Sequence, residues 1–431
     1  MAQWLRTSDP AFETRFASLL ATRREQDNDV GETVAAIVRD VRARGDEALI
    51  ELTRRYDRYD LTIERMRLAE TEIDAAVAEC PARVCEALEF AARRIEAYHR
   101  RQRPADERFT DHAGIELGHR WTAVEAAGLY VPGGLAAYPS SVLMNAIPAK
   151  VAGVSRLAMT VPTPDGILNP QVMAAARIAG IDEIYRVGGA QAIAALAYGT
   201  GTIAAVAKIV GPGNAYVAAA KRQVFGAVGI DMIAGPSEIV ILADSDNEPA
   251  WIAADLLAQA EHDASAQSIL ITESDALAAG VAAEVERQLK VLPRRELAGA
   301  SWRKFGAIIL VKTLHEAVAL VDRLAPEHLE IAGGEAEALA AAVRNAGAIF
   351  IGRFTPEAVG DYVAGPNHVL PTARTARFSS GLNVLDFLKR TSILKLDAAG
   401  LRALGPDAVT LARAEGLEAH ARSIAVRLDR A

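Results

Sequence analysis

Apolar and polar residues follow two different patterns along the chain, and the change from one to the other divides it. From about residue 11 to residue 103, apolar residues recur every three or four positions with charged residues between them, as in Val34–Val41 and Ala82–Tyr98. This spacing places the apolar side chains on one face of a helix. The first part of the chain is therefore predicted to be helical.

From Arg156 onward, short runs rich in β-branched residues alternate with alanine-rich helical segments. Strands joined by helices favour a largely parallel, doubly wound sheet. The same rhythm starts again after a break, and Gly235-Pro236 is the expected crossing point between two successive units. The predicted strands are Arg156–Val161, Glu183–Val187, Val206–Val210, Glu238–Leu242, Gln267–Thr272, Ala307–Val311, His328–Ile331 and Ala348–Ile351.

These patterns predict an α/β protein with two nucleotide-binding-like, incomplete Rossmann-type units whose sheets are mostly parallel. An N-terminal helical segment, residues 1–128, is expected to join the second unit. The first α/β unit is assigned to residues 129–236 and the second to residues 237–380. The tail, residues 381–431, reads as helical and falls outside both units, so we expect it to dock on a partner subunit.

Charge and cysteine content narrow the class of protein. The chain has 47 basic and 55 acidic residues, a net charge of −8, which disfavours a nucleic-acid partner because phosphate binding needs a clustered basic surface. Its two cysteines, Cys80 and Cys85, lack the paired CxxC spacing of a structural zinc site. Scarce cysteine and a start without an apolar targeting segment predict a cytoplasmic protein.

Val187–Ala207 is a stretch of 21 residues without a charged side chain. Its length raises the question of a membrane span. However, it is built mainly from small residues and is interrupted by glycines, so its transfer into lipid would be unfavourable. A buried helix, and no membrane contact, is the prediction.

Gln259 and His262 are the clearest candidates for metal ligands. They stand three residues apart, which on a helix places both side chains on one face. Asp361 and His420 are candidates to complete a site of four nitrogen and oxygen ligands. Spacing alone does not show this, because ligands a hundred residues apart depend on the fold to bring them together.

Ile209–Tyr216 contains a glycine-rich turn between a predicted strand and a predicted helix. Glycines at such a turn let backbone N–H groups approach a phosphate, and the start of the helix favours negative charge. The run lacks the third glycine of the usual dinucleotide fingerprint, so a tight turn without a ligand is an equal alternative. Val187–Gln191 has the same pattern of strand, glycines and helix, and Tyr130–Gly134 is expected to begin the first α/β unit.

Glu327 and His328 form an adjacent carboxylate and imidazole just before a predicted strand. An imidazole can accept a proton near neutral pH, and a neighbouring carboxylate can polarise water or orient the ring. The alternative is an ordinary surface pair at the start of a strand.

Several blocks of the chain together resemble the histidinol dehydrogenase family over essentially the whole length. The family's signature region stands here as residues 230–238, Ile-Asp-Met-Ile-Ala-Gly-Pro-Ser-Glu. The supporting blocks are Gly211–Asn214, Gln259–His262, Pro326–Glu330, Gly365–His368 with Pro371-Thr372, and Glu415–Leu417 with His420.

The resemblance implies roles for individual residues. It implies a homodimer in which His420 and Glu415 reach the site of the other subunit, which would account for the tail. It makes Glu327 and His328 the catalytic pair. The implied zinc ligands are Gln259, His262, Asp361 and His420; the implied NAD contacts are Tyr130, Gln191 and Asn214; and the implied substrate contacts are Ser237, His328, Glu415 and the four zinc ligands.

The implied reaction is the oxidation of L-histidinol through L-histidinaldehyde to L-histidine with two NAD⁺, the last steps of histidine biosynthesis. His328 suits the base for the alcohol proton, and Glu327 suits the activation of water that adds to the aldehyde. Zinc would hold the substrate's imidazole and amino nitrogens and so orient it.

Three alternatives remain. A relative on the same scaffold could oxidise another small alcohol, such as a sulfonated diol, although Glu415 and every ligand position are retained. A zinc hydrolase would have no use for the Gly211–Asn214 turn. A non-catalytic binding protein would have no use for Glu327 and His328.

Overall fold

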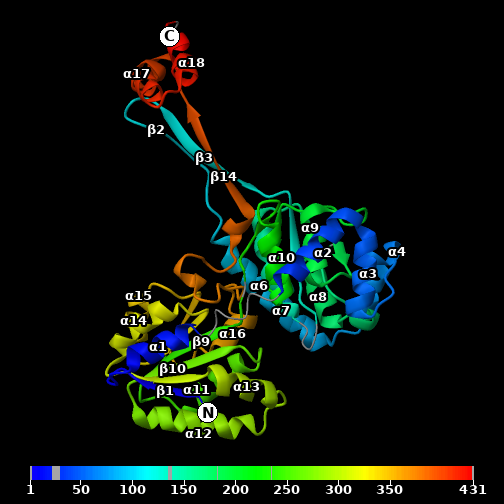
Figure 1. Cartoon of the computed structure of the whole chain (residues 1–431), viewed down its shortest axis with the longest axis vertical. Coiled ribbons are helices and arrows are strands. Elements are labelled where there is room, and N and C mark those ends of the chain that lie inside the picture. The colour runs from blue at the N-terminus through cyan, green and yellow to red at the C-terminus, as the bar shows by residue number, and fades with distance from the viewer. Residues whose placement is uncertain (1, 22–29, 134–137, 182, 234, 430–431) are drawn as a thin grey trace. The chain divides into compact units, whose positions relative to one another are not determined.

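The computed structural model describes residues 2–21, 30–133, 138–181, 183–233 and 235–429. By their contacts these residues form two compact units (Figure 1). Unit 1 comprises residues 1–101 and 125–387, and unit 2 comprises residues 102–124 and 388–431. Unit 2 is therefore built from an internal segment together with the C-terminal tail.

Unit 1 contains a sheet with the strand order β1-β11-β10-β9-β12-β13, in which every neighbouring pair is parallel. Its central strand, β9, follows directly on the crossing point predicted at Gly235-Pro236. The strands are β1 (Gln3–Arg6), β9 (Glu238–Ala243), β10 (Gln267–Thr272), β11 (Ala307–Leu310), β12 (His328–Ala332) and β13 (Ala348–Ile351).

Helices cover both faces of this sheet, because its strands are apolar on both sides. Ile239 and Ile241 of β9 pack with one group of helices, and Val240 and Leu242 pack with the other. The first group is α11 (Pro249–Ala260), α12 (Asp275–Leu289) and α13 (Arg295–Phe305); the second is α1 (Phe12–Ala21), α14 (Leu314–Leu324) and α15 (Ala336–Ala342).

A second parallel sheet in unit 1 has the order β6-β5-β4-β7-β8. Gly128 in β4 lets α9 approach closely, since a Cβ there would lie 2.9 Å from Leu196 Cδ1. The strands are β4 (Ala126–Tyr130), β5 (Arg156–Thr160), β6 (Glu183–Tyr185), β7 (Lys208–Val210) and β8 (Gly229–Ile230). The helices in the core of one face are α2 (Gly31–Arg44), α3 (Asp46–Asp57), α9 (Gly189–Tyr198) and α10 (Ala215–Val224).

The remaining elements of unit 1 are helical. They include α16, which carries one of the candidate ligands. The helices are α4 (Ile63–Met66), α5 (Glu70–Ala78), α6 (Ala82–Arg100), α7 (Pro139–Ala152), α8 (Pro170–Ile178) and α16 (Glu357–Tyr362), with three short 3₁₀ turns at Pro164–Gly166, Thr375–Arg377 and Val384–Phe387.

Unit 2 is an antiparallel sheet of order β14-β3-β2 followed by two helices. Strand β14 (Leu388–Lys395) pairs along its whole length with β3 (Glu116–Ala123), and β2 (Glu107–Thr110) pairs with the other side of β3. The helices are α17 (Ala398–Ala414) and α18 (Glu418–Leu428), which pack on each other where Gly405 meets Leu428. The tail is thus helical, as predicted, but it begins with a strand that the prediction missed.

The predicted fold class is confirmed: the chain is α/β with mostly parallel sheets, N-terminal helices and a helical tail. All eight predicted strands are present, with ends that differ by no more than two residues. The domain boundaries at residues 128, 236 and 380 stay predictions. Gly134 of the Tyr130–Gly134 run and Ala234 of the signature region lie outside the described residues.

In the charge-free stretch Val187–Ala207, the helix α9 ends at Tyr198, and Gly199 follows it with φ of 76°. The apolar run is therefore split by a turn. Across the described ranges of the chain, no helix is both long enough and apolar enough to cross a membrane.

Candidate active site

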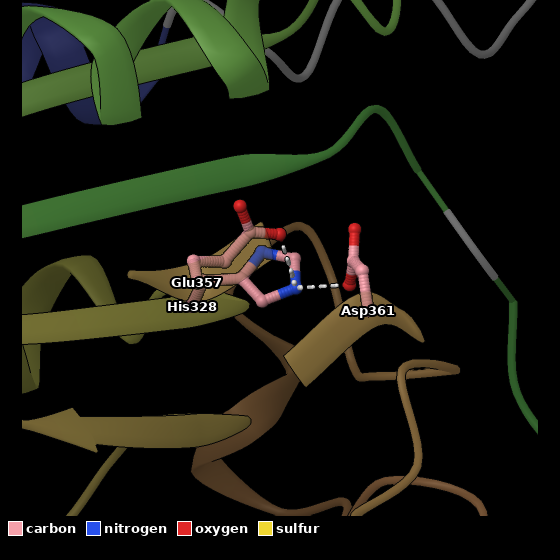
Figure 2. A group of neighbouring side chains, drawn as sticks. All are labelled: His328, Glu357 and Asp361. Carbon is pink, nitrogen blue, oxygen red and sulfur yellow. Dashed lines mark ion pairs between the residues drawn. The ribbon is translucent and has the colours of Figure 1, made fainter. Parts of the chain in front are cut away.

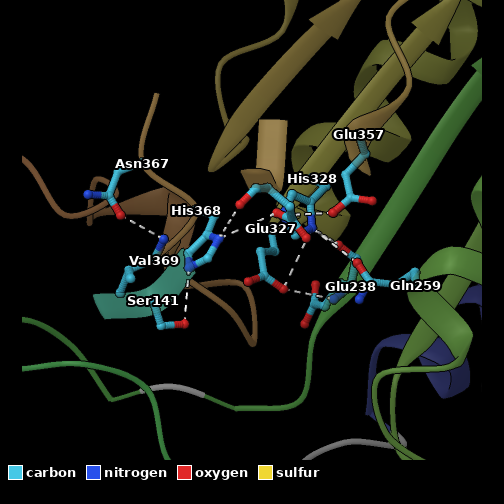
Figure 3. Close-up of polar contacts among 10 residues, drawn as sticks. Ser141, Glu238, Gln259, Glu327, His328, Glu357, Asn367, His368 and Val369 are labelled. Atoms are coloured by element: carbon cyan, nitrogen blue, oxygen red, sulfur yellow. Dashed lines mark hydrogen bonds and ion pairs between the residues drawn. The ribbon is translucent and has the colours of Figure 1, made fainter. Parts of the chain in front are cut away.

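His328 lies at the centre of a group of buried polar side chains at the amino edge of the six-stranded sheet (Figure 3). It is the first residue of β12 and is 3% exposed. Glu238, the first residue of β9, is its neighbour in the sheet, since β9 and β12 are parallel and paired. Helix α11 runs back to this edge, which brings Gln259 near its end to the imidazole.

The hydrogen bonds of His328 fix the tautomer of its ring. Its Nδ1 lies 3.1 Å from the carbonyl oxygen of Glu238 and 3.1 Å from Oε1 of Gln259. Both atoms are acceptors, so Nδ1 carries the proton and Nε2 carries a lone pair. Burial lowers the pKa of His328 to about 4, against the opposing effect of Asp361, so the ring is neutral near pH 7.

Glu327 directly precedes β12 and is 6% exposed. Its Oε2 accepts a hydrogen bond of 2.9 Å from the backbone N–H of Glu238 and lies 3.8 Å from Nδ1 of His328. Gly347 makes room for the Glu327 backbone, because a Cβ at that position would lie 2.5 Å from the Glu327 carbonyl oxygen. The predicted adjacent pair is therefore buried in the site, and the alternative of a surface pair is wrong.

Glu357 and Asp361 face Nε2 of His328 from one side of α16 (Figure 2). Glu357 Oε1 lies 3.5 Å and Asp361 Oδ1 3.9 Å from Nε2. Burial, together with the nearby charge of Asp361, raises the pKa of Glu357 to about 10, which favours the neutral acid. The three side chains each offer one ligand atom within 4.8 Å of the others, a spacing that a metal ion could bridge.

Gln259 and His262 are both at this site, but not on one helix as the spacing suggested. Helix α11 ends at Ala260, and His262 lies in the following turn, where its N–H donates to the carbonyl of Gln259 (3.2 Å). The expected helical geometry for this pair is therefore wrong. Burial lowers the pKa of His262, and the charge of Asp361 acts in the opposite direction. Asp361 therefore lies close enough to affect the imidazole of His262.

His368 also belongs to the site. Its Nδ1 lies 2.8 Å from the backbone oxygen of Asp361, and its Nε2 lies 3.2 Å from Oγ of Ser141 (Figure 3). The preceding residue, Asn367, donates to the carbonyl of Met144 at 2.6 Å and holds the loop against α7. His368, which ends the Gly365–His368 block, therefore lies beside a candidate ligand.

Buried atoms without partners mark where a ligand would fit. Within the described part of the chain, Gln259 Nε2, His328 Nε2 and Glu357 Oε1 have no hydrogen-bond partner although each is shielded from solvent. Leaving such atoms unpaired costs about 1–3 kcal/mol each. A cluster of imidazole, amide and carboxylate groups with unsatisfied atoms fits a zinc ion and a polar substrate.

The candidate NAD residues lie at the carboxyl edge of the five-stranded sheet, where nucleotides bind in many open α/β sheets. Tyr130 ends β4 and its hydroxyl accepts a hydrogen bond of 3.1 Å from the N–H of Gly189, at the start of α9. Gln191 is on α9 and buried. Asn214 is the N-cap of α10, with Oδ1 accepting from the N–H groups of Tyr216 and Val217.

Glycines allow segments of the chain to approach each other closely at this edge. Gly211 has φ of 115°, and a Cβ there would lie 2.2 Å from the carbonyl oxygen of Tyr130. A Cβ at Gly188 would likewise lie 2.4 Å from the Cβ of Pro162. Both turns therefore need glycine, and each leads into a helix N-terminus, a place that favours the phosphates of a dinucleotide.

The remaining predicted residues have different surroundings. Ser237 directly precedes β9 and Glu238, so it is close in sequence to the site. Glu415 and His420 belong to unit 2, where Glu415 is the C-cap of α17, His420 is on α18, and both are exposed. Their part in a site stays a prediction.

Sequence reasoning missed two residues of the site. Glu357 is an acidic residue in the first turn of a helix, the ordinary place for such a residue. Glu238 is the first residue of a strand, and its contact with His328 is made by the backbone carbonyl. The side chain of Glu238 accepts a hydrogen bond from the N–H of Ala373. The place of Glu238 follows from the sheet register and that of Glu357 from the packing of α16, and neither leaves a local signal in the sequence.

Comparisons with known proteins identify the family of this chain. A family model described as histidinol dehydrogenase matches residues 20–428. The histidinol dehydrogenase of Brucella suis biovar 1 (strain 1330) is 64% identical over 429 residues, which covers 100% of both chains. That of Bradyrhizobium diazoefficiens is 65% identical over 422 residues, or 98% of each chain.

The solved structures give the same result. The crystal structure of histidinol dehydrogenase from Elizabethkingia anophelis matches with a TM-score of 0.94 at 35% identity, covering 100% of this chain and 98% of that one. Sequence and fold therefore agree, and the chain belongs to the histidinol dehydrogenase family, a family of oxidoreductases in histidine biosynthesis.

Proposed function

We propose that this chain oxidises L-histidinol through L-histidinaldehyde to L-histidine, using two NAD⁺ in succession and one zinc ion per subunit, in the cytoplasm. The observation that carries the proposal is the neutral, buried imidazole of His328. Its Nδ1 is held by Glu238 and Gln259, and within the described residues its Nε2 has no hydrogen-bond partner. Such a ring is prepared to accept one proton from a substrate alcohol. The alternative of another small alcohol is not favoured by relatives at 63–65% identity that are named histidinol dehydrogenase.

NAD⁺ and zinc would each supply one function when bound. NAD⁺ supplies the hydride acceptor, and zinc supplies a binding point for the substrate's nitrogens. We assign the zinc to Gln259, His262, Asp361 and the partner's His420, and the NAD⁺ to Tyr130, Gln191 and Asn214. Ser237 and Glu415 would contact the substrate.

The chain's own residues then perform the proton transfers. His328 accepts the alcohol proton at Nε2 in the first oxidation. In the second, Glu327 accepts a proton from the water that adds to the aldehyde carbon, because an aldehyde must be hydrated before another hydride can leave. The N–H of Glu238 holds the Glu327 carboxylate in place for this step. Burial of both side chains excludes bulk water from the reacting groups.

A homodimer is supported by the surface of unit 2. Large apolar side chains of β14, α17, α18 and the turn between the two helices are exposed to solvent in the described part of the single chain. They are Leu394, Leu404, Leu411, Leu417 and Val426. Exposed apolar groups of this kind are typical of subunit interfaces. A tail that reaches a partner would bring Glu415 and His420 to the partner's site.

The overall reaction is tested by counting products. Purified protein given L-histidinol and NAD⁺ should form two NADH per histidine. Activity should fall on chelation of the metal and return when zinc is restored. Protein with zinc bound that forms no NADH from L-histidinol would contradict the assigned substrate, and an unchanged rate after complete metal removal would contradict the role of zinc.

Glu327→Gln should slow the second oxidation by about 10²–10⁴-fold and the first much less, because the amide cannot accept the proton of the attacking water. Stopped-flow measurement with L-histidinol and with L-histidinaldehyde separates the two steps. The amide oxygen can still accept from the Glu238 N–H, so folding should be retained. Equal slowing of both oxidations would show that Glu327 does not act on the water.

His328→Asn and His262→Asn distinguish the two possible ligand groups of the site. His328→Asn should slow the alcohol oxidation by about 10²–10⁴-fold and leave the zinc content unchanged, since His328 acts as the base. His262→Asn should lower the zinc content. Metal analysis of both purified variants is the measurement. Loss of zinc from His328→Asn would assign the metal to the group of His328, Glu357 and Asp361 instead.

Hybrid dimers test the contribution of the tail. His420→Asn and Gln259→Ala should each be inactive alone. If His420 serves the partner's site, random mixing of the two variants should restore about a quarter of the wild-type activity, since half of the dimers are hybrids and each has one intact site. Mixing two preparations of His420→Asn is the control. No recovery in verified hybrids would place all ligands of a site in one chain.

A further inference from the structure

The turn after β7 is held by a buried ion pair that the reaction itself does not use. Lys221 on α10 and Asp231 just after β8 form this pair, with side chains 2% and 0% exposed. Lys221 Nζ also donates to the carbonyl of Gly211 at 2.9 Å, and Asp231 Oδ2 accepts from the N–H of the same residue at 2.8 Å. Both polar groups of one glycine are thus fixed by two opposite charges.

The backbone conformation of Gly211 determines the path of the chain through this turn. Its φ of 115° is a conformation that favours glycine, and it lies against the carbonyl of Tyr130 at the end of β4. Three residues later, Asn214 caps α10. The peptide groups of Gly211 therefore set where Asn214 and the first N–H groups of α10 point.

Stability alone does not account for this arrangement. A buried ion pair loses hydration on folding, and a pair of apolar side chains of similar size is often as stable or more so. Lys221 and Asp231 each contact the backbone of the turn as well as each other. A pair of apolar side chains would fill the space but would leave the N–H and carbonyl of Gly211 without these partners.

We propose that Lys221 and Asp231 are positioning residues of the dinucleotide site, which hold Gly211–Asn214 in the binding shape before NAD arrives. The inference rests on the proposed function, which assigns NAD to this turn. A turn that is already ordered loses little freedom on binding, whereas a loosened turn must be ordered at the expense of affinity. The half-buried ion pair Arg156–Glu183 serves as a control. It lies at the start of β5 and β6, at the opposite edge of the same sheet.

Binding of NADH to the full-length protein, followed by its fluorescence, is the direct test. Lys221→Met and Asp231→Asn should each weaken NADH binding by about 10-fold or more, because the binding-competent turn becomes a minor population. The KM for NAD⁺ should rise in parallel, while the KM for L-histidinol and the zinc content stay as in the wild type. Arg156→Met, which breaks the ion pair at the start of β5 and β6, should leave NADH binding unchanged.

The double variant Lys221→Met/Asp231→Leu keeps the test valid if a single variant fails to fold. It leaves no unpaired buried charge, so its thermal stability should recover while its affinity for NADH stays weak. Folded variants that bind NADH as tightly as the wild type would overturn the inference, as would equal weakening by Arg156→Met. If the wild-type protein itself binds no NADH, the assignment of NAD to this edge fails, and the inference fails with it.

Discussion

The site depends on the burial of one imidazole with a fixed orientation. His328 is enclosed by β9, β12, α11 and α16, and its Nδ1 is held by the Glu238 carbonyl and the Gln259 amide. Burial holds the pKa of the ring well below its usual range, so the neutral form is present near pH 7. Because Nδ1 carries the proton, Nε2 keeps a lone pair, which is what the proposed role as base requires.

The same burial acts on the carboxyl groups around the ring. It raises the pKa of Glu357 to about 10 and that of Glu330, two residues beyond His328, to about 9. Asp255, one turn before Gln259 on α11, adds to the effect on Glu330. Neutral acids can donate hydrogen bonds, so several carboxyl groups can be close together without strong repulsion. A dense group of polar side chains is thereby maintained in an apolar interior.

The proposed catalytic residues and the candidate NAD residues occupy opposite edges of their respective sheets. Glu238 and His328 begin strands of the six-stranded sheet, whereas Tyr130 and Gly211 follow strands of the five-stranded sheet. One segment, residues 231–238, connects the two. Asp231 at its start bonds Gly211, and Glu238 at its end bonds both Glu327 and His328. Asp231 and Glu238 belong to the region, residues 230–238, on which the family resemblance of the sequence rests.

The sequence by itself determined the α/β class and eight of the strands, because periodicity and glycine-rich turns are local properties. It also singled out Glu327 and His328 as an adjacent pair, and their catalytic role stays a prediction. The predicted strands did not include β1, β2, β3, β4, β8 or β14, and the pairing of β14 with β3 joins segments some 270 residues apart. Tertiary structure alone decided that Glu357 faces His328, that α11 ends before His262, and that Lys221 and Asp231 meet at Gly211. These contacts are set by sheet register and helix packing, which bring distant residues together and leave no local pattern in the chain.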